Sequence, residues 1–575
     1  MLLICHPDSP PTSSGNTLFW HCFLDKQYLL WYTSALEFSD EEIRSQLDSL
    51  DSEEDLYLGP SYSFILWDKK LKKHWVQVDE FATCPLFFFA SKGFFYVTDI
   101  FKELVDLCNH SLKINQDFVQ EYLQPFATSK VVHNQTVYDE IERILPQHRL
   151  LIDINGNFVL EHYLKNWIPK YKNHHPDEIV QHVRDHFIAS IHQSTASNNQ
   201  VAANLSGGLD SSSIVSNLLH LNRNVRALYA VIDGKEADES LYIQAIEVYF
   251  SNFYADKIPV PPAKYSSVQS TTILMGQPDG MAAPSALHIP LFAAVKENNI
   301  SLFFSGHGGD SIIGTNEFYS SAIWENQNFQ VLNQWKTSSH FRFSHYLSAW
   351  IKASTVWREK GILFFLTKQF KCFLHGVLPV TNLKIFAKQL IQIPRERSKP
   401  FLPKIKQLQT PIGLTSEQKK HWESHFSQIT ITANELLYVL GRTYGTKVVF
   451  PLQDFDLFEW ALCFSSERNF ALGARRGLLR EAMKGILPEK IRQRTSKATF
   501  TTYLCHSLRN LLQAFPEKTE MTFQENLFIS KKEWAKWKIT KEEVLKNKKV
   551  SMKQIEQCFK ITYFLIWLNN FPPSS

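Results

Sequence analysis

The sequence predicts two domains of different fold class, a strand-rich α+β domain followed by an α/β domain with a doubly wound parallel sheet. At 575 residues the chain is long enough to form two large cores. Up to about residue 168, short apolar runs alternate with turn residues, which is typical of strands. From about Pro176 the apolar residues recur with helical spacing, and strands then alternate with helices. We therefore predict domains at residues 1–168 and 172–575.

The composition indicates a globular chain and argues against several classes of protein. Hydrophobic residues make up 44% of the chain and charged residues 21%, and the net charge of +4 does not point to nucleic acid as a partner. The eight cysteines include no Cys-x-x-Cys pair, which argues against a zinc site or a disulfide framework. Residues 361–380 come nearest to a membrane span but contain Lys368 and Lys371, and residues 1–5 lead into His-Pro-Asp, unlike a signal peptide. We expect a soluble, cytoplasmic protein.

In the first domain, apolar runs separated by turns predict antiparallel hairpins. Residues 69–73 and 91–93 are the expected turns of the first two hairpins. The predicted elements are strands at residues 61–68, 74–78, 85–90 and 94–97, a helix at 115–123, and a stretch at 141–154 that ends in a strand.

In the second domain, one amphipathic helix precedes a series of buried strands. Apolar residues follow the helical period from Ile179 to Ile191, with Asp177 as the predicted N-cap. Strands are predicted at residues 201–205, 225–232, 253–258 and 300–304. Because helical segments separate these strands, we expect a parallel sheet that binds ligands at the carboxyl ends of its strands.

The stretch Asn204–Val215 combines a strand, a Gly-Gly turn and the start of a helix, an arrangement that presents backbone N–H groups to an anion. Gly207 and Gly208 lack a Cβ, so the backbone can approach a pyrophosphate closely. Ser206, Ser211 and Ser212 add hydroxyl donors, and Asp210 can hold a Mg2+ that the phosphates also bind. A serine-rich turn without ligand is the alternative.

This loop resembles the Ser-Gly-Gly-x-Asp-Ser pyrophosphate loop of ATP pyrophosphatases, which adenylate a carboxyl or carbonyl oxygen. It lacks the Gly-Lys-Ser/Thr ending of a Walker A loop. The resemblance implies ATP as a ligand. The implied nucleotide-binding residues are Leu205, Ser206, Gly207, Gly208, Asp210, Ser211 and Ser212, with Val231 on the following strand.

A second glycine-rich turn, Ser305–Asp310, follows the fourth predicted strand. It resembles the Ser-Gly-Glu-Gly-x-Asp loop of asparagine synthetases, whose Asp shares Mg2+ with the Asp of the first loop. The resemblance therefore implies Asp210 and Asp310 as metal ligands, and Ser305 and Gly306 as further nucleotide contacts. Two carboxylates on one hard cation are sound coordination chemistry. Taken alone, Asp310 would be a turn residue.

His307 stands where asparagine synthetases have a catalytic Glu. A neutral imidazole can accept the proton of an attacking ammonium near neutral pH. A loop histidine that lines the pocket is an equally weighted alternative. Asp238-Glu239 and Pro278-Asp279 correspond to acidic positions of the family near the acceptor and the nucleotide, with an N-cap and a turn as their alternatives.

The run from Leu487 to Lys497 resembles the C-terminal part of asparagine synthetases. The resemblance assigns to Lys497 the family's lysine that contacts pyrophosphate and developing negative charge. A solvent-exposed surface lysine is the alternative. Arg476 and Arg480 are expected to face acidic neighbours or solvent.

The order of features in the first domain resembles the glutaminase-like domain of the asparagine synthetase family, an Ntn-type αββα sandwich. Members that use glutamine have an N-terminal cysteine as the nucleophile that releases ammonia. Here the chain begins Met1-Leu2-Leu3, and Cys5 lacks an adjoining free amine. We therefore expect a degenerate domain, and a nucleophile other than ammonia.

Residues 315–430 have no clear counterpart in the family. They are aromatic-rich and mostly helical by pattern, and basic residues far outnumber acids from Lys352 to Lys406. Such a surface can receive a peptide, a partner protein or an anionic membrane. The alternative is that these helices only cover the sheet.

The resemblance implies adenylation of a carboxylate by ATP, attack by an amine, and release of AMP and pyrophosphate. Without an ammonia source we expect the amine to lie on the substrate itself, as in β-lactam synthetases and lasso-peptide cyclases. The two loops look more like those of the cyclases, which join a core peptide's N-terminal amine to an Asp or Glu side chain. Such enzymes act on a precursor peptide with a leader-binding protein and a leader protease. The alternatives are a β-lactam-type or other small-molecule amide synthetase, an ammonia-dependent asparagine synthetase and a non-catalytic scaffold.

Overall fold

The protein is described here from a computed structural model of residues 1–575. The structure describes residues 2–572 apart from 7–8, 15–18, 35, 50–55, 60, 92, 109–111, 125–131, 165, 172–173, 197, 199, 252, 282, 314–319, 338–342, 379–407, 466–475, 495 and 517–527. Arg475 and parts of segment 315–430 therefore lie outside the described residues.

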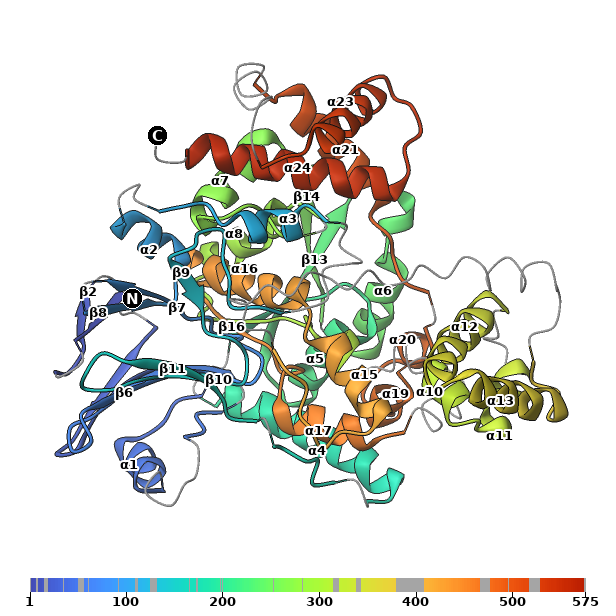
Figure 1. The fold of residues 1–575 in the computed structure, drawn as a ribbon, viewed down its shortest axis with the longest axis horizontal. Helices are drawn as coiled ribbons and strands as arrows, with labels where there is room; N and C mark the ends of the chain where they lie inside the picture. The colour runs from blue at the N-terminus through green and yellow to red at the C-terminus, as the bar shows by residue number, and fades with distance from the viewer. Residues whose placement is uncertain are drawn as a thin grey trace.

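The N-terminal part contains two packed antiparallel sheets (Figure 1). One has the order β2 (Thr12–Ser14), β1 (Leu2–Cys5), β8 (Phe94–Thr98), β7 (Phe87–Ser91) and β9 (Ile141–Arg143). The other has the order β11 (Phe158–His162), β10 (His148–Ile152), β6 (Lys73–Val78), β5 (Tyr62–Asp68), β4 (Tyr28–Ser34) and β3 (His21–Leu24). Residues of both sheets share one core between the layers.

Helices cover the outer faces of the two sheets. Helix α1 (Asp40–Ser49) packs Ile43 and Leu47 against the six-stranded sheet. Helices α2 (Phe101–Leu107) and α3 (Gln116–Tyr122) lie on the side of the five-stranded sheet. The arrangement is therefore αββα, as predicted, and the hairpins β5–β6 and β7–β8 are confirmed.

The second sheet system is a single five-stranded parallel sheet. Its order is β14 (Asp256–Val260), β13 (Asn224–Ile232), β12 (Gln200–Asn204), β15 (Leu302–Phe304) and β16 (Lys447–Val449). All four pairings are parallel. Successive strands run outward from β12 to β14, and the order then reverses with β15. This topology is the predicted doubly wound sheet, with its switch point between β12 and β15.

Helices connect and flank these strands. They are α4 (Pro176–Ser194), α5 (Leu209–His220), α6 (Ser240–Tyr249), α7 (Tyr265–Met275), α8 (Ile289–Glu297), α9 (Gly309–Ile312), α15 (Ser416–His425), α16 (Gln428–Tyr444), α17 (Phe455–Cys463), α19 (Gly477–Ala482), α20 (Glu489–Arg492), α21 (Thr501–Gln513), α23 (Lys531–Leu545) and α24 (Met552–Asn570).

The predicted cap of α4 is wrong by two residues. His175, and not Asp177, is the N-cap: its side chain accepts from the N–H of Asp177, while Glu178 accepts from the N–H of His175. Pro176 occupies the first helical position, where a missing N–H costs nothing. Asp177 therefore lies inside the first turn.

Four helices form a separate lobe, the helical lobe. They are α10 (Ser320–Glu325), α11 (Phe329–Thr337), α12 (Phe343–Glu359) and α13 (Ile362–Leu374). Trp324, Tyr346 and Trp357 are buried in a core that this lobe does not share with the sheets. Figure 1 shows α11, α12 and α13 (yellow) at the end of the molecule opposite the N-terminal sheets. The idea that this segment only covers the sheet is therefore wrong.

Helix α16 joins the two sheet systems. Arg143 of β9 forms a buried ion pair of 3.1 Å with Glu435, and the hydroxyl of Tyr438 donates to Asp99 at 2.8 Å. The C-terminal helix α24 is largely buried. Within the described residues, no helix is both long and apolar enough to cross a membrane.

Candidate active site

The two glycine-rich turns meet at the switch point of the parallel sheet. One turn leaves β12 and enters α5, and the other leaves β15 and enters α9. Because β12 and β15 are neighbouring parallel strands, both turns leave the same edge of the sheet. Doubly wound sheets bind ligands in the crevice at this position. The fold thus brings together the two motifs that the sequence placed about 100 residues apart.

Glycine is required where the turns approach each other. Gly207 has φ +67°, and a Cβ there would lie 2.8 Å from the Cβ of Tyr242. A Cβ on Gly306 would lie 3.0 Å from the backbone nitrogen of Ser211, and a Cβ on Gly309 would overlap the carboxylate of Asp210. The absence of these side chains lets the second turn pack directly onto the start of α5.

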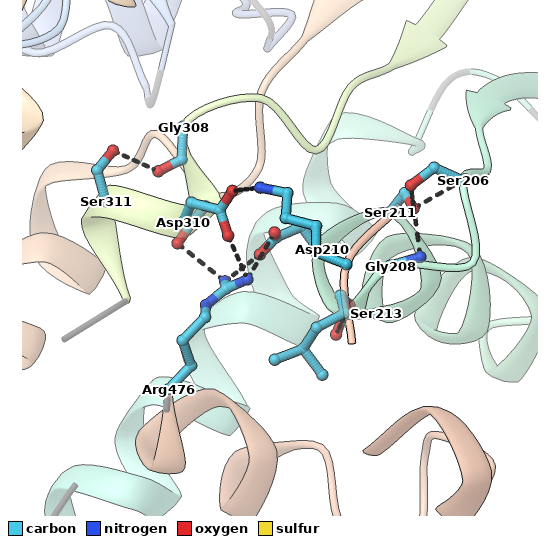
Figure 2. A network of polar contacts seen from close by, with 12 residues as sticks. Ser206, Gly208, Asp210, Ser211, Ser213, Gly308, Asp310, Ser311 and Arg476 are labelled. Atoms are coloured by element: carbon cyan, nitrogen blue, oxygen red, sulfur yellow. Dashed lines mark hydrogen bonds and ion pairs between the residues drawn. The ribbon is translucent and has the colours of Figure 1, made fainter. Parts of the chain in front are cut away.

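Serine hydroxyls hold the first turn in shape. The Oγ of Ser211 accepts from the N–H of Ser206 at 3.1 Å and lies 3.1 Å from its Oγ (Figure 2). The N–H of Gly208 points to the Oγ of Ser206 at 3.4 Å. The Oγ of Ser212 is buried and has no hydrogen-bond partner among the described residues.

Two predicted nucleotide contacts have different surroundings. The side chain of Leu205 is fully buried, and its N–H donates to the carbonyl oxygen of Leu228 at 2.9 Å. Val231, near the carboxyl end of β13, is 42% exposed. Any contact from Leu205 to a ligand would therefore involve its backbone, whereas the side chain of Val231 is accessible.

Asp210 and Asp310 converge on one positive group, the guanidinium of Arg476. Its Nη1 lies 2.7 Å from Oδ2 of Asp210 and 3.0 Å from Oδ1 of Asp310. Its Nη2 contacts the other oxygen of Asp210 and donates to the carbonyl oxygen of Gly309 at 2.9 Å. Figure 2 shows the guanidinium between the two carboxylates. The sequence left acidic neighbours or solvent open for Arg476, and the structure places it against acidic neighbours.

Lys497 completes this charged cluster. Its Nζ lies 2.6 Å from Oδ2 of Asp310, while most of its side chain is in solvent, with 80% exposed. An exposed lysine that holds one carboxylate can move to another anion at small cost, because surface ion pairs contribute little. Lys497 is therefore placed beside both glycine-rich turns.

The cluster sets the protonation of its members. Burial alone would raise the pKa of Asp310, but attraction by Arg476 and Lys497 outweighs it and holds that pKa below its ordinary value. For Asp210 burial dominates and raises the pKa, although Arg476 offsets part of the increase. Burial would lower the pKa of Arg476, but the two carboxylates outweigh it and raise that pKa.

These donors fit a hard divalent cation. Two carboxylates from separate turns already share one cationic group, and oxygen ligands of this kind are what Mg2+ prefers. The guanidinium of Arg476 contacts the same oxygens that a shared metal would use. Asp210 and Asp310 are therefore suitable metal ligands, on the condition that Arg476 moves away from one or both.

His307 lies in the second turn, near His288 and His425. Burial lowers its pKa, and the backbone of Thr430 and the charge of Asp310 oppose this only in part. Its Nε2 is buried and has no hydrogen-bond partner among the described residues. His288 and His425 lie close enough that His307 lowers the pKa of both in addition to burial. His307 is therefore neutral near pH 7, as an acceptor of protons must be.

The other predicted acidic residues, Asp238 and Asp279, accept hydrogen bonds from neighbouring parts of the chain. The exposed Asp238 accepts from the N–H of Ser240 at 2.9 Å, close to the start of α6. Asp279 accepts from the backbone and hydroxyl of Ser285 at 2.8 and 2.7 Å, which is a turn role. The turn alternative thus describes Asp279, whereas the N-cap of α6 is Glu239 and not Asp238.

Arg494 is a charged residue of the site that sequence reasoning missed. It lies 2.6 Å from the carboxylate of Glu239 and donates to the carbonyl oxygen of Gly207 at 2.9 Å. Its guanidinium also stacks 3.8 Å from the ring centre of Tyr242. Its place in the run before Lys497 was visible in the sequence, but its partners lie more than 250 positions away.

A parallel sheet with two glycine-rich turns at its switch point is consistent with an ATP-pyrophosphatase-type domain. Residues 182–528 match the family described as asparagine synthase, and residues 57–164 match the glutamine amidotransferase domain. Because the first match spans more than half of the chain, the protein belongs to the asparagine synthase family. The architecture is thus an N-terminal glutaminase-like domain and a C-terminal asparagine synthase domain.

Two individual comparisons are more distant. Asparagine synthetase [glutamine-hydrolyzing] 1 of Bacillus subtilis (strain 168) is 21% identical over 498 residues, which cover 82% of this chain and 72% of that protein. The structure of the allosteric regulatory enzyme of purine biosynthesis is matched at 10% identity over 44% of this chain and 58% of that chain, with a TM-score of 0.15. That score carries no structural argument.

Proposed function

We propose that the protein is an ATP-dependent amide-forming ligase that closes a macrolactam ring in a ribosomal lasso peptide. One observation carries the ligase part of this proposal: Asp210, Asp310 and Lys497 converge at the switch point of an asparagine synthase domain. Family membership supports ATP-dependent amide formation, and the resemblance of both turns to those of lasso-peptide cyclases supports the ring-forming branch.

In the proposed reaction, an Asp or Glu side-chain oxygen of the peptide attacks the α-phosphorus of ATP. Pyrophosphate leaves and an acyl-adenylate forms. The peptide's N-terminal amine then attacks the acyl carbon, AMP leaves, and the amine loses a proton. Adenylation replaces a poor leaving group with a good one, and the site then has to hold the amine in line with the acyl carbon.

Each charged residue has a proposed part in the first step. Backbone N–H groups of Gly207 and Gly208, with the hydroxyls of Ser206, Ser211 and Ser212 and the turn at Ser305 and Gly306, bind the nucleotide, with Leu205 and Val231 beside it. Asp210 and Asp310 would hold Mg2+, which would neutralise charge on the phosphates. Lys497 moves from Asp310 to the departing pyrophosphate as negative charge develops there.

His307 is the proposed proton acceptor of the second step. Its lowered pKa keeps the ring neutral. Its Nε2 is buried and makes no hydrogen bond among the described residues, so this atom is available to a substrate. A neutral imidazole in a buried site accepts a proton from the attacking amine more readily than solvent-exposed carboxylates can.

The cysteines of the first domain support an amine that does not come from glutamine. Cys5, Cys22, Cys84 and Cys108 all have a raised pKa because of burial, which reaches about 12 for Cys5 and about 11 for Cys108. A nucleophilic cysteine needs the opposite shift, towards the thiolate. We infer that none of these four residues releases ammonia, and that this domain is a scaffold.

The helical lobe supports a substrate larger than a metabolite. Lys420 of α15 pairs with Glu325 of α10, and the ring of His421 lies 3.0 Å from the carbonyl oxygen of Ser311 in α9. Helix α15 therefore contacts both the helix that follows the second glycine-rich turn and the first helix of the lobe, and it links the lobe to the site. We propose a precursor peptide as substrate, delivered by a leader-binding protein and a leader protease.

Ammonia-dependent asparagine synthesis is the second candidate, because the Bacillus subtilis relative is an asparagine synthetase. A β-lactam-type synthetase would use the same adenylation residues on a small molecule. The candidates differ in the amine, and a single assay separates them.

The test is incubation of the purified protein with ATP, Mg2+ and the core of the precursor peptide, with the processing partner present. Loss of one water from the peptide's mass, together with AMP and pyrophosphate, is the expected result. Pyrophosphate release driven by aspartate and ammonium, with no change in peptide mass, would replace the proposal with asparagine synthesis. Release driven by another small acid would indicate the small-molecule synthetase, and no turnover would contradict an enzymatic function.

A further inference from the structure

Helix α13 carries a large exposed apolar face on the helical lobe. Seven large hydrophobic side chains of this helix are exposed, among them Leu363 at 77%, Phe370 at 62% and Phe373 at 66%. The full set is Ile362, Leu363, Phe364, Leu366, Phe370, Phe373 and Leu374. No other described helix exposes as many, and so concentrated an apolar surface marks an interaction site.

The face is held in place from the opposite side of the helix. Phe365 and Cys372 point into the core of the lobe, where they are 6% and 0% exposed. At 3.6 residues per turn, six of the exposed side chains fall within about 120° on another side of the same helix, and Phe364 lies about 80° beyond them. The helix is therefore docked by one side and presents a stiff apolar strip about 20 Å long with the other.

Positive charge borders this strip. The ammonium groups of Lys360 and Lys368 lie 5.6 and 5.3 Å from the ring centre of Phe364, and α13 contains no acidic residue. Burial lowers the pKa of Lys368, and the nearby charges of Lys371 and Lys360 lower it further. Like charges gather here without a compensating anion on the helix.

The basic character belongs to this segment and not to the rest of the chain. Residues 352–406 contain 12 Lys or Arg and 2 Asp or Glu. The whole chain has 61 and 57, so the remaining residues have 49 basic and 55 acidic side chains and are net negative. Positions 379–406 lie outside the described residues; within residues 352–378, five Lys or Arg stand against one acid. An anionic surface would therefore be attracted to the described part of this segment.

We propose that α13 and its flanking lysines form a membrane-surface anchor, in which the apolar strip enters the headgroup region of an anionic bilayer. Apolar side chains on one side of a helix with lysines at the border are the features of an interfacial helix, in which the lysine stems stay in the apolar zone and the charges reach the phosphates. Figure 1 shows α13 at one end of the molecule, away from the N-terminal sheets. This inference does not depend on the proposed reaction.

The test is co-sedimentation of the full-length protein with vesicles of phosphatidylcholine alone or mixed with phosphatidylglycerol. The protein is expected to sediment with the mixed vesicles, and added salt is expected to weaken this binding. The triple variant Leu363→Gln, Phe370→Gln, Phe373→Gln is expected to bind about 100-fold more weakly, because each side chain loses apolar burial in the bilayer. The variant Lys368→Gln, Lys371→Gln should reduce the preference for the anionic vesicles.

The matched control is Val248→Gln, Ile539→Gln, which removes two exposed apolar side chains from α6 and α23. It is expected to bind vesicles as the wild type does. Absence of binding to the mixed vesicles, or equal binding by the triple variant, would overturn the proposal. Sedimentation velocity without lipid tests the rival occupant: a wild-type dimer that the triple variant converts to a monomer would assign the strip to a contact between two copies and overturn the anchor.

Discussion

The two domains differ in where their chemically reactive side chains lie, as strand β1 and the segment after β12 show. Cys5 lies on β1 between two layers of the sandwich, fully buried, and burial raises its pKa to about 12. Asp210 and Asp310 lie in the first turns of α5 and α9, just beyond the ends of β12 and β15, where Arg476 and Lys497 pair with their charges. A side chain inside a strand is committed to the core, whereas one in a turn at a sheet edge can meet a ligand. This contrast is consistent with the proposal that the second domain carries the chemistry and that the first domain supports it.

The largest expected effect is at the paired carboxylates. We expect Asp210→Asn and Asp310→Asn each to lower pyrophosphate release about 1000-fold, because one neutral amide cannot replace a carboxylate as a ligand to a hard cation. Steady-state pyrophosphate assays with peptide and Mg2+ measure this. Asp238→Asn is the matched control, since Asp238 is exposed and its hydrogen bonds among the described residues are with the N–H of Ser240 and the hydroxyl of Tyr229, and it should retain most activity. Full activity in either site variant would remove the metal assignment.

A smaller and step-specific effect is expected at His307. His307→Ala should leave pyrophosphate release nearly unchanged while ring closure slows about 100-fold, because only the second step needs a proton acceptor. Single-turnover assays that follow pyrophosphate and cyclised peptide separately test this. If both steps fall by the same factor, His307 has a structural role in the turn.

The next prediction concerns Glu80, a buried acid of the first domain. Burial, and then the nearby Asp79, raises its pKa to about 8 from an ordinary value of 4.5. The folded state therefore keeps a proton that the unfolded state has lost, and the stability associated with Glu80 falls as pH rises from about 4.5 through about 8. We expect Glu80→Gln to gain about 4 kcal/mol relative to wild type between pH 5 and pH 9.

Urea unfolding of both proteins at the two pH values measures this difference. Glu41→Gln at an exposed site is the control for the substitution itself, measured in the same way. If the difference in free energy of unfolding between Glu80→Gln and wild type is the same at both pH values, the Glu80 carboxyl stays ionised in the folded protein. The first domain would then also contain a buried charged carboxylate, as the second does.

The smallest expected effect is at Cys5. Cys5→Ala should leave peptide cyclisation within about twofold of wild type, because a buried thiol with a raised pKa supplies no nucleophile. Cyclisation rate and thermal unfolding are measured together, so that a loss of packing is distinguished from a loss of chemistry. A variant that has the thermal stability of wild type but no longer makes product would show that Cys5 takes part in the reaction, and the first domain would then not be a scaffold alone.

Local patterns account for most of what the sequence could predict. The hairpins β5–β6 and β7–β8, the strands β12 and β13 and the helix α5 all follow from apolar spacing and turn residues in short stretches. The glycine-rich turns were also recognisable, since each is six or so consecutive residues with defined backbone requirements.

Long-range contacts account for what could not be predicted. Strand β16 has only three residues, and its pairing with β15 depends on a separation of about 145 positions. Arg476 reaches Asp210 across 266 positions, and the separate core of the helical lobe depends on how Trp324 and Trp357 meet. The sequence pattern identifies such side chains as charged or apolar, but tertiary packing decides their partners.

The most direct test of the central claim traces the nitrogen of the new amide. The protein, its peptide, ATP and Mg2+ are incubated with glutamine labelled with 15N at the side-chain amide, and the product is analysed by mass spectrometry. We predict a peptide that has lost one water and carries no label, with the glutamine unchanged. A labelled amide in the product, formed together with glutamate, would show that the first domain releases ammonia and would contradict its role as a scaffold.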